Sequence, residues 1–585
     1  MRSFVKPPVA LLPLLGALWL AACSSGGPAV PSVDMPPEAR PATTQSHQQA
    51  QSVITDGLAA RGAVAKIKGE RERDRPAMEE KFIAAASAPA KMAQVLSSPD
   101  FRYATEPTNT ENYGHFDDNP VKRVADHPVS TFSIDVDTGA YANVRRMLHQ
   151  GQLPVKDAVR VEEMINYFSY DYPRPKDTTQ PFAVTTELAP APWNHQAMLL
   201  RVGLKGYDIA AEKLPPANLV FLVDVSGSML SPDKLPLLQN GLGLLVQQLR
   251  AQDRVSLVVY AGNTGVLLPP TPGDQKATIR AALASLTAGG STNGAAGIRL
   301  AYAMAEQAYI KGGINRVLLA TDGDFNVGTV SFEALKNLVE EKRKTGISLT
   351  TLGLGAGNYN DHLMEQLADA GNGNYAYIDT LNEANKVLVS EMSSTLQTIA
   401  KDVKIQIEFN PATVTEYRLI GYENRALKRE DFNNDKVDAG DIGAGHTVTA
   451  LYELTLAGSA GGRMDPLRYQ RESRDSQANK SEIALLRLRY KLPESDSSKL
   501  LEQPIRTAEI KDASQMSVDF RFASAVAGFG QLLRGGRYTE HFGYDQVLAL
   551  AQDARGKDAF GYRGEFISLV NLAKTLDGGS KAALR

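Results

Sequence analysis

An apolar, strand-like run ends abruptly in three oxygen-bearing side chains, and this junction constrains the chain more than any other stretch. Residues 218–223 read Asn-Leu-Val-Phe-Leu-Val, and Asp224, Ser226 and Ser228 follow at intervals of two. One turn therefore offers a carboxylate and two hydroxyls. Hard cations such as Mg²⁺ prefer oxygen donors, few protein carboxylates, and room for water or a partner's oxygen. The spacing predicts a divalent-cation site at the end of a strand.

Two further candidate ligands lie downstream of this motif. Thr292 stands in a Gly-Gly-Ser-Thr-Asn-Gly segment, and Asp322 follows a second strand-like run at residues 316–320, with Thr321 between them. Short motifs of common residues arise by chance, but five oxygen ligands in a fixed order are far more specific. The alternative is a Ser- and Asp-rich turn that caps the strand and the next helix.

In order and rough spacing, these residues resemble the metal-ion-dependent adhesion site of von Willebrand factor type A (VWA) domains, the family that includes the integrin I domains. The Asp-x-Ser-x-Ser motif of that family falls on Asp224, Ser226 and Ser228. The family's Thr falls on Thr292 and its final Asp on Asp322.

The resemblance implies how such a site would work. In the family, the serines and the threonine contact the metal directly, while the two aspartates act partly through water. It implies Mg²⁺ as the cofactor, with Mn²⁺ or Ca²⁺ as alternatives, and a protein ligand whose Glu or Asp completes the metal shell. In integrin I domains the last helix shifts when ligand binds; here that helix is expected at residues 383–396.

Strands and helices alternate regularly from residue 218 to about residue 396. This alternation predicts an α/β unit, a doubly wound and mostly parallel sheet with helices on both faces. Ligands of such open sheets bind at the carboxyl ends of the strands. Asp224, Thr292 and Asp322 all map to loops at that edge, so the motif and the predicted topology agree.

On both sides of this unit the apolar period changes to two. Two strand-like runs precede it, at 182–188 and 198–205, and they are too few to form a stable sheet alone. We therefore expect them to pair with strands that follow, so that the VWA unit is inserted into a β-rich, sandwich-like domain with a helical C-terminal tail at 523–576. The following strands are expected at 403–409, 414–420, 446–456 and 483–491.

The N-terminus has the features of a targeting segment. Arg2 and Lys6 precede an apolar stretch at residues 9–22 that is too short to span a bilayer comfortably. Its end, Leu-Ala-Ala followed by Cys23, resembles the lipobox of bacterial lipoproteins. That resemblance implies a lipidated Cys23 that anchors the protein to a membrane of the cell envelope. Ser24 in place of Asp points to the outer membrane, facing the periplasm or the surface.

These patterns divide the chain of 585 residues into six parts. Cys23 is the one cysteine, so we expect no internal disulfide. Residues rich in Pro, Ala, Gln and Ser favour disorder down to about Tyr113, with order expected from near Val129. The predicted parts are a signal peptide (1–22), the lipidated Cys and a disordered tether (23–112), an α+β segment (113–216), the VWA domain (217–400), a β-sandwich-like domain (401–500) and a helical C-terminal region (501–585).

Composition and missing motifs disfavour two broad classes of function. The net charge is −3 and no basic stripe stands out, so nucleic acid is not an expected partner. The sequence has no His-Glu-x-x-His, Gly-x-Ser-x-Gly or phosphate-loop motif, and its eight histidines are scattered. We therefore expect no enzyme activity.

A second pair of carboxylates, Asp135 and Asp137, is also spaced by two. Such a pair can bind a cation, but a helix is predicted to begin near Ala140. The favoured interpretation is that Asp137 or Thr138 caps that helix.

The acidic segment at 431–441 has some features of an EF-hand loop. It departs from that pattern because Lys436 occupies the position of the invariant Gly, and an Ile stands where the bidentate Glu belongs. A solvated acidic loop is favoured over a Ca²⁺ site.

The expected function is that of a membrane-anchored envelope lipoprotein that binds a partner through the cation site. Two alternatives remain open. The chain could be a structural scaffold with a vestigial metal site, or an accessory subunit of an ATPase-driven envelope assembly. An interaction that ignores cations would favour the scaffold, and co-purification with an ATPase would favour the accessory subunit.

Overall fold

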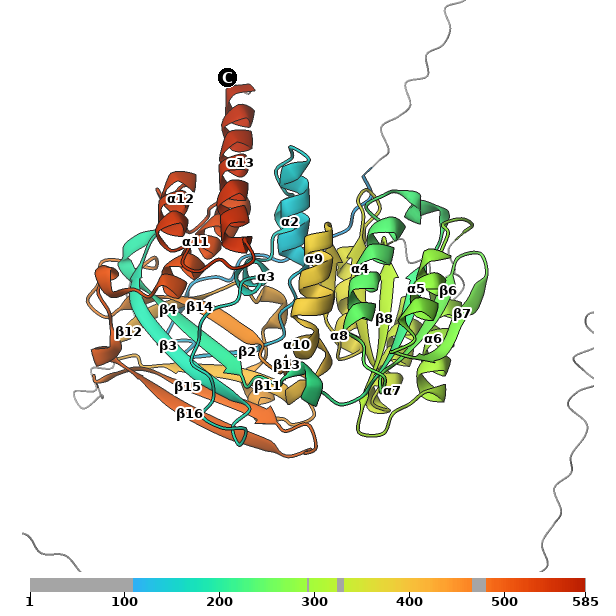
Figure 1. Ribbon diagram of the computed structural model, residues 1–585. Helices are drawn as coiled ribbons and strands as arrows, with labels where there is room; N and C mark the ends of the chain where they lie inside the picture. Colours follow the sequence, from blue (N-terminus) through green and yellow to red (C-terminus); the bar gives the residue numbers. More distant parts are fainter. Residues whose placement is uncertain (1–108, 292–293, 324–330, 466–479, 584–585) are drawn as a thin grey trace, which may run out of the picture. The chain divides into compact units, whose positions relative to one another are not determined.

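The computed structural model describes residues 109–291, 294–323, 331–465 and 480–583, which Figure 1 shows as a ribbon. The predicted signal peptide, Cys23 and nearly all of the predicted tether lie outside these ranges. The described residues form one six-stranded sheet and two five-stranded sheets. No helix among them is long and apolar enough to cross a membrane.

The six-stranded sheet has the order β10-β9-β8-β5-β6-β7. Neighbouring strands are parallel except for β7, which runs antiparallel to β6 at the edge. The sequence analysis did not predict β7, because its prolines argue against a strand except at the edge of a sheet, which is where β7 lies. The strands are β5 (Ala217–Asp224), β6 (Arg254–Tyr260), β7 (Thr264–Pro272), β8 (Ile314–Thr321), β9 (Ser348–Leu354) and β10 (Tyr375–Ile378).

Helices cover both faces of this sheet, so the predicted doubly wound α/β fold is confirmed. Alternate residues of β5 separate two apolar cores: Leu219, Phe221 and Val223 lie in one, and Val220 and Leu222 in the other. The first core contains α4 (Leu235–Gln248), α5 (Lys276–Ala284) and α9 (Leu381–Asn385); the second contains α6 (Gly294–Gln307), α7 (Phe332–Lys344) and α8 (Asp361–Ala370).

The last helix of the unit differs from the expected continuous helix at 383–396. A π-helical turn, η4 (Lys386–Ser390), separates α9 from α10 (Met392–Leu396). The π turn begins at a buried lysine, Lys386. Its ammonium lies 2.7 Å from a Glu391 carboxylate oxygen and 4.3 Å from the centre of the Tyr167 ring. Such single π turns are local irregularities that sequence periodicity does not reveal.

Strands from both sides of the VWA unit build the sandwich, as predicted. β4 pairs with β14 from Met198↔Leu454 to Lys205↔Thr447, and β2 pairs with β11. One sheet has the order β1-β12-β14-β4-β3; the other has β13-β11-β15-β16, with β2 beside β11. The strands are β1 (Lys122–Arg123), β2 (Val129–Ser133), β3 (Phe182–Ala191), β4 (Asn194–Gly206), β11 (Thr398–Phe409), β12 (Val414–Ile420), β13 (Gly440–Gly443), β14 (Thr447–Leu456), β15 (Glu482–Lys491) and β16 (Ser498–Arg506).

The C-terminal helices pack with two helices from the N-terminal side of the VWA unit. Phe168, Phe522 and Phe566 contact one another edge to face within a core that also includes Leu199 of β4 and Leu451 of β14. The helices are α2 (Gly139–His149), α3 (Val161–Asn166), α11 (Val518–Leu533), α12 (Tyr544–Asp553) and α13 (Tyr562–Ala583).

Order begins earlier than the sequence suggested. The expectation of disorder down to about Tyr113 is wrong for residues 109–112, because Thr110 donates its amide to the Gly357 carbonyl (2.8 Å) and Asn112 donates to Tyr359 (2.9 Å). These contacts join residues that lie nearly 250 positions apart, so local composition could not predict them.

One buried arginine joins three parts of the fold. Arg145 of α2 is 2% exposed and donates to Asp379 and Glu383 at the start of α9, and to Glu565 of α13. The distances from its nitrogens are 2.7 Å to Asp379 Oδ2, 2.8 Å to Glu383 Oε2 and 3.0 Å to Glu565 Oε2. The guanidinium is the shared counter-ion of these carboxylates.

Replacing Arg145 with Met should lower the free energy of unfolding by about 3–5 kcal/mol, because two buried carboxylates lose their counter-ion. Chemical denaturation of the full chain measures this. The matched control is Arg521→Met, which breaks a partly exposed pair with Asp553 and should cost less than about 1 kcal/mol. Equal losses for the two variants would contradict the prediction.

Glu162 of α3 is a buried acid whose burial outweighs the nearby positive charge of Arg160. It is 2% exposed, and its Oε2 atom accepts no hydrogen bond from the described residues. Burial, and then the negative charge of Glu423, raise its pKa from the ordinary 4.5 to about 7. The native state therefore holds a proton that the unfolded chain releases at lower pH.

This raised pKa predicts stability that is present below pH 4.5 and is lost as the pH rises towards 7. Across that window the free energy of unfolding should fall by up to about 1.4 kcal/mol per pH unit for this one group. Glu162→Gln removes the proton equilibrium and should make the decline less steep, whereas the exposed control Glu502→Gln should not. Denaturant titrations between pH 4.5 and 8 decide between these outcomes.

Candidate metal centre

Asp224 is the last residue of β5 and is completely buried. One carboxylate oxygen, Oδ1, accepts the Ser226 amide at 2.8 Å, and the other, Oδ2, accepts the Thr321 hydroxyl at 3.0 Å. Thr321 ends β8, the strand beside β5. The carboxylate is therefore held in one orientation at the carboxyl edge of the sheet.

The two serines converge beside this carboxylate. The Ser226 and Ser228 hydroxyl oxygens lie 3.0 Å apart, with Ser226 buried and Ser228 exposed. Between them, Gly227 donates its amide to the Gly290 carbonyl at 3.0 Å. This bond brings the segment that leads towards Thr292 next to the first motif, although Thr292 itself lies outside the described residues.

Asp322 follows β8 directly and is also completely buried. Its Oδ2 atom accepts a hydrogen bond from the Lys234 ammonium at 2.8 Å, and Lys234 also lies 3.3 Å from the Asn358 side-chain oxygen. Burial raises the pKa of Asp322, but the hydrogen bond and charge of Lys234, with a smaller contribution from Ser228, outweigh burial and lower it overall.

The two carboxylates differ in how well their charge is compensated. Burial raises the pKa of Asp224, and the nearby negative charge of Asp322 adds to this rise, against the hydrogen bonds from Ser226 and Thr321. Among the described residues no ion pair is found for Asp224, whereas Asp322 pairs with Lys234. A buried carboxylate beside two convergent hydroxyls is an oxygen donor set that fits a hard divalent cation.

The sequence singled out four of these side chains but missed three others. Thr321, Lys234 and Asn358 help to hold the carboxylates, and only Thr321, next to Asp322, lay beside a recognised motif residue. Lys234 and Asn358 approach the site through the fold, and no spacing rule used above could identify them.

The acidic segment at 431–441 is engaged by lysines. Lys404 donates to the carbonyl oxygens of Asp431 (3.1 Å) and Asn434 (2.6 Å), and Lys491 donates to that of Asp435 (2.7 Å). Lysine ammonium groups thus occupy carbonyl oxygens that a Ca²⁺ ion would need as ligands. This favours the interpretation of the segment as an acidic loop over that of a Ca²⁺ site.

The expected capping role of Asp137 or Thr138 is wrong. Thr138 makes no side-chain cap, and the Ala140 amide donates instead to Glu163 of α3, at 2.8 Å. Asp137 accepts the Tyr375 amide of β10 at 2.8 Å. The first turn of α2 is thus satisfied by a carboxylate from another helix, so Asp137 is available to contact the VWA unit.

Comparison with known proteins agrees with this architecture. The family described as von Willebrand factor type A domain matches residues 218–391, the one described as von Willebrand factor matches 107–201, and "Uncharacterized protein YfbK, C-terminal" matches 394–576. The uncharacterized protein YfbK of Escherichia coli K12 is 53% identical over 471 residues, which cover 79% of this chain and 81% of YfbK.

Two more distant similarities cover less of the sequence or of the fold. The magnesium-chelatase 60 kDa subunit of Cereibacter sphaeroides is 36% identical over 140 residues, 24% of this chain and 25% of that protein. Among solved structures, the von Willebrand factor type A protein from Catenulispora acidiphila has 15% identity and a TM-score of 0.36, and the match covers 66% of this chain and 89% of that one.

A divalent cation at this site would compete with the Lys234 ammonium for the Asp322 carboxylate. Lys234→Met should therefore raise Mg²⁺ affinity by about tenfold or more, because a unit charge a few Å from a divalent ion costs at least about 1.4 kcal/mol. Calorimetric titration of the full chain with MgCl₂ measures the affinity. The conservative control Lys234→Arg, which keeps the charge, should not bind Mg²⁺ more tightly; unchanged or weaker binding by Lys234→Met would refute the competitor role.

Proposed function

The chain belongs to the von Willebrand factor type A proteins that carry a YfbK-type C-terminal region, and we propose that it binds a protein partner through a divalent cation. Proteins with VWA domains commonly mediate protein interactions, often with a metal at this motif. The observation that supports the proposal most is the convergence of Asp224, Ser226, Ser228 and Asp322 at one sheet edge.

The chemistry of each side chain indicates the role it would have at the cation site. Ser226, Ser228 and Thr292 would hold the cation through uncharged hydroxyls, with Asp224 and Asp322 balancing its charge. Mg²⁺ is the expected cation, with Mn²⁺ or Ca²⁺ as alternatives. A metal held largely by neutral oxygens attracts an external carboxylate, so the partner presents a Glu or Asp.

The surface beside the site supports contact with a large ligand. The short helix that contains Ser228, η3 (Gly227–Leu230), buries Met229 completely and leaves Leu230 72% exposed. A large apolar side chain next to a charged site is a suitable contact for a protein surface, because it adds apolar burial to the polar contact.

We further propose that the protein is a lipoprotein of the bacterial cell envelope, held at the outer membrane through lipidated Cys23, with no nucleic-acid partner and no enzymatic role. The support is the sequence pattern that ends in Cys23. An anchor placed more than 80 residues before Asn109 would leave the folded part free to reach a partner.

The test is capture of partners from envelope extract by the full chain, in Mg²⁺ and in EDTA. Ser228→Ala removes one ligand from an exposed position and should abolish Mg²⁺-dependent capture without affecting folding. Asp224→Ala should do the same, with circular dichroism as the folding check. The matched control is Asp274→Ala, an exposed aspartate in the same domain, which should capture like the wild type.

Each outcome decides between the candidates. A partner retained by wild type only in Mg²⁺ supports cation-dependent adhesion and identifies the ligand. Partners that are indifferent to EDTA and to both variants would make the scaffold the leading explanation. Co-purification of an ATPase under those conditions would favour the accessory subunit.

A further inference from the structure

A cavity of about 490 Å³ lies at the opposite end of β8 from Asp322. It is lined by residues of β8 and β9, of the loop before β10, of α10 and of the sandwich strands. Its volume is within the range of small-molecule sites, which is about 300–1,000 Å³. Its wall has one cationic and one anionic feature whose charges the described residues compensate incompletely.

The cationic feature is Arg316 near the start of β8. It is 3% exposed and donates through Nη1 to the Thr350 hydroxyl at 2.6 Å, while its Nε has no hydrogen-bond partner in the described part of the chain. Burial lowers the pKa of Arg316 to about 10, against the attraction of Asp441. The guanidinium therefore stays charged at neutral pH.

Arg316 differs from the other buried arginines of the described residues. Each of those contacts at least one carboxylate as an ion pair, whereas no ion pair is found for Arg316 among the residues that the structure describes. A buried charge without a partner is costly and is usually retained for a function. The paired arginines are Arg145, Arg160, Arg201, Arg418 and Arg563.

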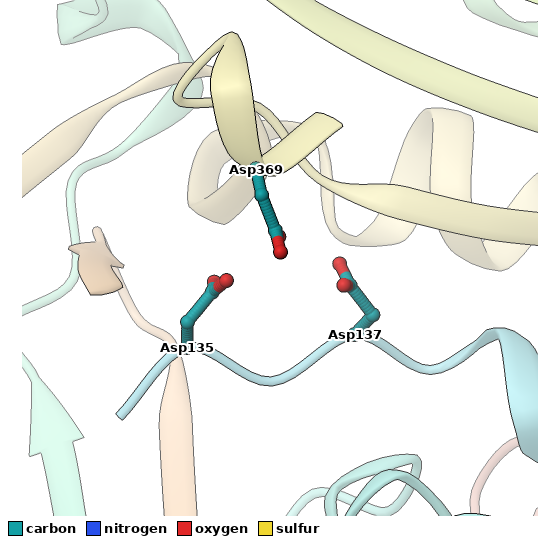
Figure 2. Close-up of side chains that lie close together, drawn as sticks. All are labelled: Asp135, Asp137 and Asp369. Carbon is teal, nitrogen blue, oxygen red and sulfur yellow. The ribbon is translucent and has the colours of Figure 1, made fainter. Parts of the chain in front are cut away.

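The anionic feature is a cluster of three aspartates in the same cavity wall. Asp135, Asp137 and Asp369 point towards one another in Figure 2, with carboxylate oxygens within 4.8 Å. Arg425 is their counter-ion: its Nη1 lies 3.0 Å from Asp135 and 2.6 Å from Asp369, and its Nη2 lies 3.3 Å from Asp137. It also pairs with Glu365, so one guanidinium serves four carboxylates.

The two features lie close together in the fold. The Thr350 hydroxyl accepts a hydrogen bond from Arg316, and its oxygen lies 3.5 Å from the Asn374 backbone nitrogen. The next backbone amide, that of Tyr375, donates to the Asp137 carboxylate. A single short stretch of backbone therefore joins the surplus positive charge to the surplus negative charge.

The combination of charges selects the class of ligand. A metal ion would have to displace Arg425, whose Nη1 already lies between Asp135 and Asp369. A simple anion would be attracted by Arg316 and repelled by the aspartates of the same cavity. A small zwitterion satisfies both ends, because a carboxylate suits the planar guanidinium and an ammonium suits the aspartates.

We propose that this cavity binds a small zwitterion, an amino acid or a dipeptide, with its carboxylate on Arg316 and its ammonium on the cluster of Asp135, Asp137 and Asp369. The ligand would supply Arg316 with the anionic partner that the described residues do not. The site is separate from the candidate metal centre and does not depend on the proposed adhesive function.

The experiment is a probe series on the full chain in EDTA, which keeps the metal centre out of the measurement. The probes are glycine, β-alanine, 4-aminobutanoate, 6-aminohexanoate and glycylglycine, in which the distance between the two charges increases. Acetate and methylammonium are the single-charge controls. Thermal shift and calorimetry should show a preferred spacing among the zwitterions and no comparable effect of the single-charge probes.

Two variants test the two ends of the site. Arg316→Met should weaken binding of the preferred zwitterion roughly ten- to a hundredfold, since it removes a charge-assisted hydrogen bond. Asp369→Asn should weaken it through the ammonium end. Arg487→Met, on β15 and outside the cavity, should bind like the wild type.

The stability of Arg316→Met without ligand separates a binding role from a structural one. If Arg316 serves a ligand, this variant should melt at the wild-type temperature or above it, because an uncompensated buried charge has been removed. A large fall in melting temperature, equal effects of acetate and the zwitterions, or no effect of any probe on the wild type would each overturn the proposal. So would Mg²⁺ or Ca²⁺ binding that Asp369→Asn abolishes and Arg316→Met leaves intact.

Discussion

The fold depends on β-strand pairing across the VWA unit. β4 precedes the unit and β14 follows it, yet their backbones are paired along eight positions, and β2 pairs with β11 in the second sheet. The first sheet takes β1, β3 and β4 from before the unit and β12 and β14 from after it, so neither flank completes that sheet alone. The VWA unit therefore leaves and rejoins the same sandwich, and both of its ends are fixed by hydrogen bonds that neighbouring sequence does not supply.

Buried charge adds specificity to this arrangement. Arg145, Arg160 and Arg425 each bind carboxylates that come from other segments, and all three contact residues of α8 or of the loop and helix after β10. Such pairs add little net stability compared with apolar packing, but breaking one leaves a buried charge without its partner. They therefore favour one docking of the VWA unit on its neighbours over others of similar apolar area.

The sequence predicted what depends on local pattern. The apolar run into Asp224, the alternation of strands and helices, and the change of period after residue 400 led to the α/β unit inserted in a sandwich. It failed where distant segments meet. The cap of α2 comes from Glu163, the counter-ion of Asp137 is Arg425, and Lys234 reaches Asp322 from another loop. The spacing of residues along the sequence does not predict contacts between segments that are this far apart.

The two sites differ in what the chain itself supplies. At the metal centre, Lys234 compensates Asp322, but no described cationic side chain pairs with Asp224. At the cavity, Arg425 partly compensates the aspartates, while Arg316 has no carboxylate partner in the described ranges. Both are carried by β8, whose residues are all buried. β8 is held between β5 and β9 and spans the two sites, with Thr321 at the end that holds the Asp224 carboxylate and Arg316 near the other end.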